Sequence, residues 1–211
     1  MDPIRVLITG GCGFLGTSII SSLLTSKRYA ITAIDINPPS LGSSTFTADV
    51  RYVRCDVLDT SSLQKVFQEA RPALVIHTVG VCPLGAKRYS MKGKEVVFKV
   101  NVEGTRNVLE ASKECGAKGL VYTSSVTVVL DKMDRDFRNV DERWVAGDVD
   151  TSYGLSKVCW SLPFDRNRTT LPDFLRLFIA AVFPHFHRYI CNCSFLPPPI
   201  LSNDITNILS S

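Results

Sequence analysis

The sequence has no apolar run long enough to cross a bilayer. The longest such run in the 211 residues is Phe174–Phe183, which contains Arg176 and is about half the length of a membrane-spanning helix. The first apolar run, Ile4–Thr9, ends at once in glycines, so we expect no secretory signal there. These features predict a soluble protein, with peripheral membrane association as the alternative.

Dense positive charge and paired metal-ligand spacing are also absent. The formal net charge is +4, and no lysine or arginine run is dense enough to favour nucleic-acid binding. The seven cysteines are scattered, and the close pair Cys191 and Cys193 has no second pair to complete a metal site. We therefore expect reduced cysteines, no metal, no nucleic-acid partner and an intracellular protein.

Glycine, lysine and glutamate do not occur after Val158. All thirteen glycines precede it, whereas the last 53 residues hold six of the eleven prolines and six of the eleven phenylalanines. Prolines at this density interrupt helices, and no strand or helix period is sustained. We predict one domain over residues 1–158 and an irregular Pro- and Phe-rich tail over residues 159–211, which is not an independent domain.

The pattern up to residue 158 alternates between strands and helices. Apolar strands that are each followed by a helix are typical of a parallel sheet covered on both faces, which favours a Rossmann-like, doubly wound α/β fold. The predicted strands are Ile4–Thr9, Tyr29–Ile34, Tyr52–Cys55, Ala73–His77 and Leu120–Thr123. The predicted helices are Phe14–Leu24, a helix capped by Asp59 or Thr60 and stopped by Pro72, and Asn101–Cys115 with Gly116 as its C-cap.

A glycine-rich loop joins the first strand to the first helix. Its glycines recur at every third position, which permits a tight turn and lets backbone N–H groups approach a pyrophosphate. The N-terminus of the following helix adds partial positive charge. We predict that this loop binds a dinucleotide, with contacts from Gly10, Gly13, Phe14, Leu15 and Gly16.

Two acidic residues follow the second and third strands. Asp35 lies about twenty residues beyond the loop, where a carboxylate can bind an adenosine ribose and repel a 2′-phosphate. It therefore predicts NAD in preference to NADP, although it could also be an ordinary turn residue. Asp56, with Val57 behind it, is predicted to meet the adenine, with a solvated turn as the alternative.

A tyrosine and a lysine, Tyr153 and Lys157, are one helical turn apart. A phenol with an ordinary pKa near 10 is a poor base at neutral pH, and a nearby cation stabilises its phenolate. The pair follows Ser124 and Ser125, which end the fifth strand. Strand ends of this kind line the ligand crevice in a doubly wound sheet, so the serines, Thr78 and the glycine loop are expected to converge there.

Over residues 4–158 the sequence resembles the extended short-chain dehydrogenases, and within them the 3β-hydroxysteroid dehydrogenase branch, above all sterol-4α-carboxylate 3-dehydrogenases. The segments that carry the resemblance are Thr9-Gly10-Gly11-Cys12-Gly13-Phe14-Leu15-Gly16, Asp56-Val57, Val75-Ile76-His77-Thr78, Asn101-Val102-Glu103-Gly104-Thr105, Val121-Tyr122-Thr123-Ser124-Ser125, Asp141-Glu142-Arg143-Trp144 and Tyr153-Gly154-Leu155-Ser156-Lys157.

The resemblance implies a Ser–Tyr–Lys site and an NAD-dependent oxidation of a sterol or terpenoid 3-hydroxyl. Ser125, or Ser124 one step away, would hydrogen-bond the substrate oxygen, and Tyr153 would take the alcohol proton. Lys157 would lower the pKa of Tyr153 and bind the nicotinamide ribose, and Asn101 would support that lysine. A 4-carboxysterol would yield a β-keto acid that loses carbon dioxide readily. Cytoplasmic or endoplasmic-reticulum location and a homodimer through the Tyr153 helix are further expectations.

The sequence departs from that family at two points. After Thr78 it has Val79–Pro83 where the family has small residues, and the helix of Tyr153 runs into Pro163. We therefore expect the later strands and the C-terminal substrate domain to be absent, with the fifth strand as an exposed edge. Phe174–Phe183 is expected to pack as a short helix on the sheet or to rest against a membrane surface. The chain would be a truncated or altered product with little turnover. The alternatives are a nucleotide-sugar epimerase, a flavonoid-type reductase and a catalytically inactive dinucleotide-binding protein.

Overall fold

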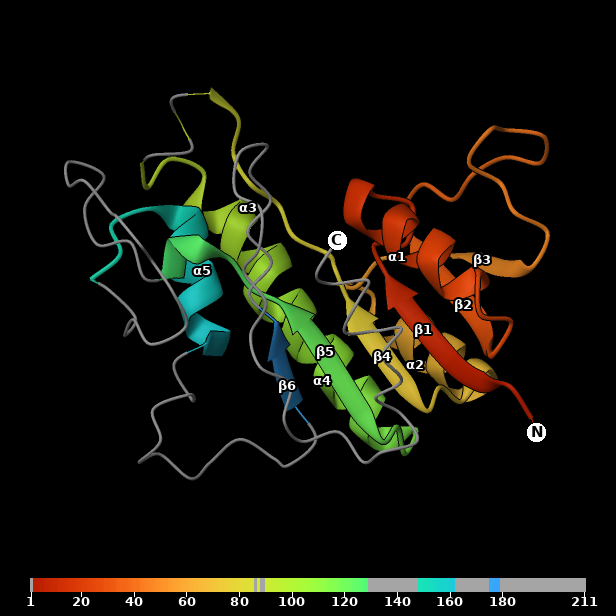
Figure 1. The fold of residues 1–211 in the computed structure, drawn as a ribbon. Coiled ribbons are helices and arrows are strands. Elements are labelled where there is room, and N and C mark those ends of the chain that lie inside the picture. The colour runs from red at the N-terminus through yellow and green to blue at the C-terminus, as the bar shows by residue number, and fades with distance from the viewer. Residues whose placement is uncertain (1, 86, 88–89, 129–147, 162–174, 179–211) are drawn as a thin grey trace.

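The structure is a computed structural model that describes residues 2–85, 87, 90–128, 148–161 and 175–178. Within these residues one sheet of parallel strands runs in the order β3-β2-β1-β4-β5-β6 (Figure 1). This order is that of a doubly wound dinucleotide-binding sheet, which confirms the predicted fold class. The strands are β1 Ile4–Thr9, β2 Tyr29–Asp35, β3 Val50–Arg54, β4 Leu74–His77, β5 Gly119–Thr123 and β6 Leu175–Phe178.

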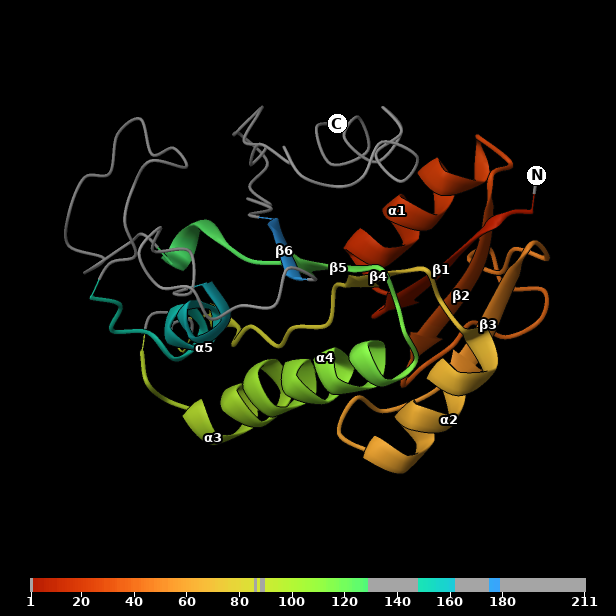
Figure 2. The same ribbon diagram turned by 90° about the horizontal axis from the view of Figure 1, so that it is seen from below.

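Helices cover both faces of the sheet. Figure 2 shows α1 on one face and α2 and α4 on the other. None of the helices in the described ranges is long and apolar enough to span a membrane. The helical elements are α1 Phe14–Leu24, α2 Thr60–Ala70, α3 Lys94–Phe98, the π-helix η2 Lys99–Gly104, α4 Thr105–Glu114, the 3₁₀-helix η3 Val126–Val128 and α5 Ser152–Ser161.

The alternating side chains of β1 separate two hydrophobic cores. Val6 and Ile8 face the core that α1 covers, whereas Leu7 faces the core covered by α2 and α4. Because successive side chains of a strand point to opposite faces, a fully buried strand is apolar at nearly every position. The run that follows Arg5 is therefore continuous rather than alternating, and it places the strand in the middle of the sheet.

The predicted cap of α2 is confirmed, whereas the predicted start of the next helix was wrong. The Asp59 side chain accepts a hydrogen bond from the backbone N–H of Ser62 at 3.1 Å, as an N-cap should. The helix expected from Asn101 instead begins as α3 at Lys94 and passes through η2 before α4. A π-helix inserts an extra residue into the turn, which helical periodicity cannot reveal.

The expectation that β5 would be an exposed edge was wrong. Residues Leu175–Phe178 form β6, which pairs in parallel with β5 from Leu120↔Leu175 to Thr123↔Phe178. The short helix expected over Phe174–Phe183 is wrong for these four residues, because the unpaired N–H and C=O groups of β5 bind an extended segment. The other residues from 162 onward lie outside the described residues. The division into residues 1–158 and 159–211 stays a prediction.

Candidate functional site

The predicted site residues follow the carboxyl ends of the strands, which meet at one edge of the parallel sheet. The glycine loop follows β1, Asp35 ends β2, and Asp56 lies just after β3. Thr78 follows β4, the two serines follow β5, and α5 carries Tyr153 and Lys157. The topology therefore gathers at one edge residues that are far apart in the sequence.

The glycine loop is a tight turn between β1 and α1. The φ angle of Gly10 is +70°, a region that glycine adopts without strain. The backbone N–H of Gly10 donates to the carbonyl of Ile34 at 2.8 Å, and that of Gly13 donates to the Gly10 carbonyl at 3.0 Å. No side chain caps α1 at Gly13. The first N–H groups of α1 are therefore available to an anion.

Gly13 and Gly16 are needed in the loop for different reasons. A Cβ atom on Gly16 would stand 2.3 Å from the Gly10 carbonyl oxygen, so the turn itself requires glycine at that position. A Cβ atom on Gly13 would meet only that same oxygen, at 3.3 Å. Gly13 thus leaves a backbone cradle that an added methyl group would fill. Such a cradle at a helix N-terminus fits the pyrophosphate of a dinucleotide.

Asp35 fastens the glycine loop to β2. Its carboxylate accepts hydrogen bonds from the backbone N–H groups of Cys12, at 3.1 Å, and Asn37, at 3.0 Å. The predicted ribose-binding carboxylate is therefore also part of the loop's structure. Of the other two loop residues predicted to bind cofactor, Phe14 is 79% exposed and Leu15 packs partly against the core under α1.

Asp56 and Val57 are placed differently from one another. The Asp56 carboxylate is exposed and accepts a hydrogen bond from the Leu58 N–H at 2.9 Å. The Val57 side chain is buried, and a Cβ atom on Gly104 would lie 2.8 Å from it. The carbonyl of Val57 accepts a hydrogen bond from Asn107. The structure therefore leaves Asp56 accessible and places the Val57 side chain in the core.

Thr78 lies beneath the glycine loop. Its hydroxyl donates to the carbonyl oxygens of Thr9, at 2.8 Å, and Gly10, at 3.2 Å. A Cβ atom on Gly10 would stand 2.9 Å from that hydroxyl oxygen. Thr78 thus joins the end of β4 to the loop after β1, which is the point where the strand order reverses.

Lys157 is a buried cation beside Tyr153, the tyrosine with which the sequence predicts that it acts. The lysine is 2% exposed, its Nζ donates to the Thr123 carbonyl at 2.9 Å, and it lies 5.7 Å from the centre of the Tyr153 ring. Burial lowers the pKa of Lys157 to about 8, and Cys82 acts in the opposite direction. The helix therefore holds the Lys157 amine next to the Tyr153 phenol, in surroundings that disfavour the charged form of the lysine.

The burial of Lys157 gives a pH-dependent prediction for stability. An unfolded lysine titrates near 10.4, so the folded protein binds fewer protons than the unfolded one between about pH 8 and 10.4. Stability from this group therefore rises with pH across that window. Relative to Lys157→Met, the wild type should gain about 3 kcal/mol in free energy of unfolding between about pH 7 and 10.5. Urea unfolding of both proteins measures the difference, and a constant difference would contradict the prediction.

Asn101 links α5 to the loop after β4. Its Oδ1 accepts a hydrogen bond from the Val81 N–H at 2.7 Å, and its Nδ2 donates to the Val81 carbonyl and to Ser156 Oγ. Ser156 in turn donates to the Tyr153 carbonyl at 2.7 Å. The η2 helix buries Asn101 and so directs its amide into this network.

Both serines after β5 are buried at the same edge. Ser124 is 4% exposed and Ser125 is 9% exposed. The Ser125 oxygen accepts hydrogen bonds from the Thr127 backbone N–H, at 3.2 Å, and the Thr127 hydroxyl, at 3.0 Å. These bonds leave the Ser125 hydroxyl proton to be donated, which is what a group that binds a substrate oxygen requires.

Sequence reasoning missed the polar residues beneath the site. His77 is fully buried, with Nδ1 at 2.6 Å from Thr9 Oγ1 and Nε2 at 2.9 Å from Thr105 Oγ1. Since Thr105 donates its proton to the Asn101 carbonyl, it accepts from a protonated Nε2. Burial, and then the charge of Lys157, lower the pKa of His77 to about 3. A histidine inside an apolar strand, with a threonine four residues after Asn101, was the available signal.

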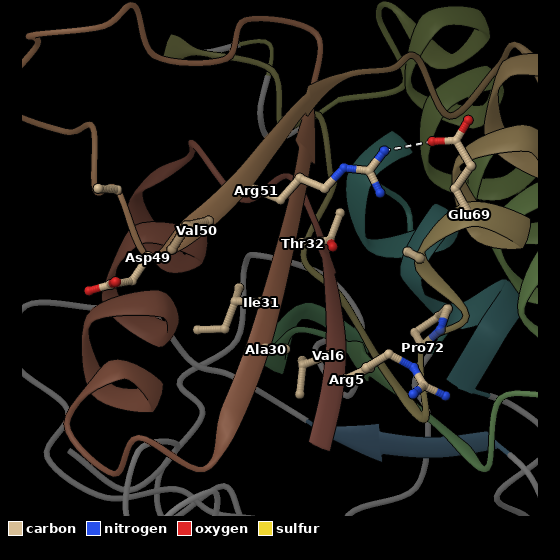
Figure 3. A pocket seen from close by; sticks show the side chains of 12 residues that line it. Arg5, Val6, Ala30, Ile31, Thr32, Asp49, Val50, Arg51, Glu69 and Pro72 are labelled. Carbon is tan, nitrogen blue, oxygen red and sulfur yellow. Dashed lines mark hydrogen bonds and ion pairs between the residues drawn. The ribbon is translucent and has the colours of Figure 1, made fainter. Parts of the chain in front are cut away.

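A concave space of about 430 Å³ lies at the opposite edge of the sheet from these residues (Figure 3). Arg5, Ala30 and Val50 line it, and they lie near the amino ends of β1, β2 and β3. An ion pair of 2.6 Å joins Arg51 to Glu69 across it. None of the predicted site residues lines this space. In the described residues no group of three or more His, Cys, Asp or Glu side chains could hold a metal ion.

Comparison with known sequences relates the chain to dehydrogenases and epimerases. The model of the 3-beta hydroxysteroid dehydrogenase/isomerase family matches residues 7–158. The sterol-4-alpha-carboxylate 3-dehydrogenase, decarboxylating, of Candida albicans is 32% identical over 146 residues, which are 66% of this chain and 39% of that protein. Human UDP-glucose 4-epimerase is 28% identical over 164 residues, 72% of this chain and 45% of that protein. The chain spans less than half the length of these curated relatives.

Comparison with solved structures gives the same fold. The UDP-glucose 4-epimerase of Thermus thermophilus, in complex with NAD, has a TM-score of 0.64 and 27% sequence identity, covering 75% of this chain and 49% of that one. The epimerase of Brucella ovis, also in complex with NAD, has a TM-score of 0.66 at 22% identity and covers 84% and 51%. The second likeness supports the fold alone.

Proposed function

This chain belongs to the 3-beta hydroxysteroid dehydrogenase/isomerase family, and from that premise we propose that it is an NAD-dependent oxidoreductase acting on the 3-hydroxyl of a sterol or related terpenoid. The observation that carries the proposal is the buried Lys157 ammonium beside Tyr153, at the sheet edge that also holds the glycine cradle. The sterol dehydrogenases and NAD-bound epimerases among its relatives support this assignment.

In this proposal the chain's own residues move and hold the substrate proton. Ser125, or Ser124 beside it, donates a hydrogen bond to the substrate oxygen, and Tyr153 accepts the proton of the alcohol. The Lys157 ammonium stabilises the Tyr153 phenolate that accepts this proton, and Asn101 and Ser156 hold the helix that carries both residues. Bound NAD supplies the hydride acceptor. With a 4-carboxysterol, the 3-keto acid product would lose carbon dioxide without further help from the protein.

Steady-state turnover tests the proposed reaction directly. The full chain is incubated with NAD and, separately, a 3β-hydroxysterol, its 4-carboxy derivative or UDP-glucose, while NADH absorbance and the products are followed. We expect NADH and a 3-ketone from the sterols, with carbon dioxide from the carboxysterol. Sugar epimerisation without sterol oxidation would favour the epimerase that several relatives represent.

A catalytically inactive dinucleotide-binding protein is the second candidate. The observation in its favour is that the chain covers 39% of the Candida albicans dehydrogenase and about half of the solved epimerases. The NAD-binding edge lies within the matched part, whereas much of each relative has no counterpart in this chain. NADH binding, by fluorescence, together with no turnover of any of the three substrates would support this candidate.

We propose that NAD(H) is bound in preference to NADP(H), through Asp35. A carboxylate at that place would accept bonds from the ribose hydroxyls and repel a 2′-phosphate. Asp35→Asn, which keeps the shape and one acceptor for the Cys12 and Asn37 N–H groups, should narrow the preference about tenfold or more. Titrations with NADH and NADPH measure the ratio of affinities.

Asp56→Asn is the matched control for this substitution. Its carboxylate is exposed at the same edge but accepts only from the nearby Leu58 N–H among the described contacts. It should change the affinity for both cofactors by similar factors and leave their ratio unaltered. Equal affinity of the wild type for NADH and NADPH would disprove the preference.

The substrate class also bears on where the protein acts. A sterol partitions into membranes, so we propose an intracellular protein, cytoplasmic or associated with the endoplasmic reticulum, that contacts membranes peripherally. A homodimer through α5 is part of the same proposal. Flotation with liposomes and sedimentation equilibrium test the two statements separately.

A further inference from the structure

Three side chains form a buried stack between the sheet and α5. The rings of His77, in β4, and Tyr122, in the neighbouring β5, are nearly parallel, with centroids 5.9 Å apart and an interplanar angle of 21°. The Lys157 Nζ lies 4.8 Å from the centroid of the Tyr122 ring. His77, Tyr122 and Lys157 are exposed by 2% or less, so water does not weaken these contacts. Figure 1 shows β4 and β5 side by side.

We propose that Tyr122 is a positioning residue, whose ring face holds the Lys157 ammonium beside Tyr153 through a cation–π interaction. A cation within about 6 Å of an aromatic centroid is attracted by the negative face of the ring, and more strongly when both are desolvated. The Lys157 Nζ meets both conditions with respect to Tyr122. The Tyr122 hydroxyl takes no part in this contact.

The ring of Tyr122 can be tested apart from its hydroxyl. It is buried and has no hydrogen-bond partner among the described residues. Desolvation, first of all, and then Tyr153 and Cys159, raise the pKa of Tyr122, so the phenol stays neutral. The residue therefore acts on Lys157 through its ring, which phenylalanine would preserve.

Several other groups act on the charge of Lys157. The Thr123 carbonyl accepts a hydrogen bond from Nζ, and Cys82 raises the lysine's pKa from the loop after β4. On α5 itself the Tyr153 ring lies 5.7 Å away, and His77 is neutral behind Tyr122. A Cβ atom on Gly80 would stand 3.2 Å from Nζ, which allows that backbone to cover the cation closely. Tyr122 is thus the aromatic face nearest to Nζ among the contacts of the described residues.

The consequence for catalysis rests on the proposed function, but the contact does not. Burial alone favours the neutral amine, which would not stabilise a Tyr153 phenolate. A ring face that favours the ammonium raises the pKa of Lys157. More of the lysine is then charged at a given pH. Removing the attraction should therefore lower that pKa.

The test is a titration of Lys157 that needs neither substrate nor cofactor. The ¹³Cε shifts of the lysines are followed against pH by NMR, and the Lys157 signal is identified by its absence from Lys157→Arg. Tyr122→Phe should leave the wild-type pKa of about 8 unchanged within about 0.3 units. Replacement of Tyr122 by 3,4,5-trifluorophenylalanine keeps the ring's shape but weakens its negative face, and should lower the pKa by about one unit.

Phe67→Leu supplies the control for a general loosening of the core. Phe67 is a fully buried aromatic residue on α2 in the same core cluster as Tyr122, whereas the described cation–π contacts of Lys157 are with Tyr122 and Tyr153. Tyr122→Leu and Phe67→Leu should cost similar stability, but only the first should lower the pKa of Lys157. Equal pKa values for phenylalanine and its trifluoro analogue would overturn the proposal. If no substrate is turned over while the pKa still follows the ring, the proposed function fails and this inference stands.

Discussion

Tyr153→Phe is expected to lower sterol turnover about a thousandfold while changing NADH affinity less than about twofold. The substitution keeps the aromatic ring that lies 5.7 Å from the Lys157 Nζ and the carbonyl that accepts from Ser156. It removes the hydroxyl that is proposed to accept the alcohol proton. Turnover is measured by NADH formation, and affinity by fluorescence titration of the same preparations.

Tyr52→Phe is the control for the loss of a tyrosine hydroxyl. Tyr52 lies in β3, far along the sheet from β5, and its hydroxyl donates to the Thr45 carbonyl at 3.3 Å. It should retain wild-type turnover. A Tyr153→Phe protein with undiminished turnover would show that another group accepts the proton. If NADH binding is lost along with turnover, the Tyr153 hydroxyl instead holds the cofactor.

Two alanine substitutions in the glycine loop are expected to weaken dinucleotide binding strongly, for different reasons. In Gly16→Ala the new methyl group would stand 2.3 Å from the Gly10 oxygen and 2.7 Å from the Gly11 Cα, both backbone atoms. The turn must then shift, at a cost of about 3 kcal/mol or more in free energy of unfolding. In Gly13→Ala the nearest atom, the Gly10 carbonyl oxygen, is 3.3 Å away and φ is −76°, so a shift of a few tenths of an ångström suffices and the fold should lose little stability.

The contrast between the two variants separates folding from binding. Gly13→Ala should lose about a hundredfold or more in NADH affinity with little change in the unfolding midpoint, because the methyl group fills the space for the pyrophosphate. Gly16→Ala should lose both affinity and stability. Urea unfolding and NADH fluorescence titration supply the two measurements. Wild-type NADH affinity in Gly13→Ala would show that the cradle does not hold the pyrophosphate.

Much of the fold could be predicted because its signals are local. The apolar run that ends in glycines predicts β1 and the loop, and Asp59 ahead of an amphipathic run predicts the start of α2. The edge at which Asp35, Thr78 and Ser125 gather follows from parallel strands alone. These inferences need no knowledge of which side chains touch, and they agree with the observed strand order.

The elements that prediction missed depend on distant partners. Residues Leu175–Phe178 form a strand because β5 presents unpaired backbone groups, and no pattern within four residues can reveal that. The η2 helix is stabilised by two hydrogen bonds to distant residues. Asn101 bonds with Val81, and Thr105, at the start of α4, bonds with His77. The contact of Tyr122 with Lys157 likewise joins residues 35 positions apart. Each depends on packing that only the assembled sheet creates.

The central place of β1 also has a consequence for synthesis on the ribosome. Among the strands of the described sheet β1 is synthesised first, yet one of its edges pairs with β2 and the other with β4, from Val6↔Leu74 to Thr9↔His77. At typical translation rates of about 5–20 residues per second, the second edge waits several seconds for its partner. During that time a row of backbone groups on an apolar strand is free to pair with other chains. A nascent chain that pauses before Leu74 is therefore a natural client for chaperones.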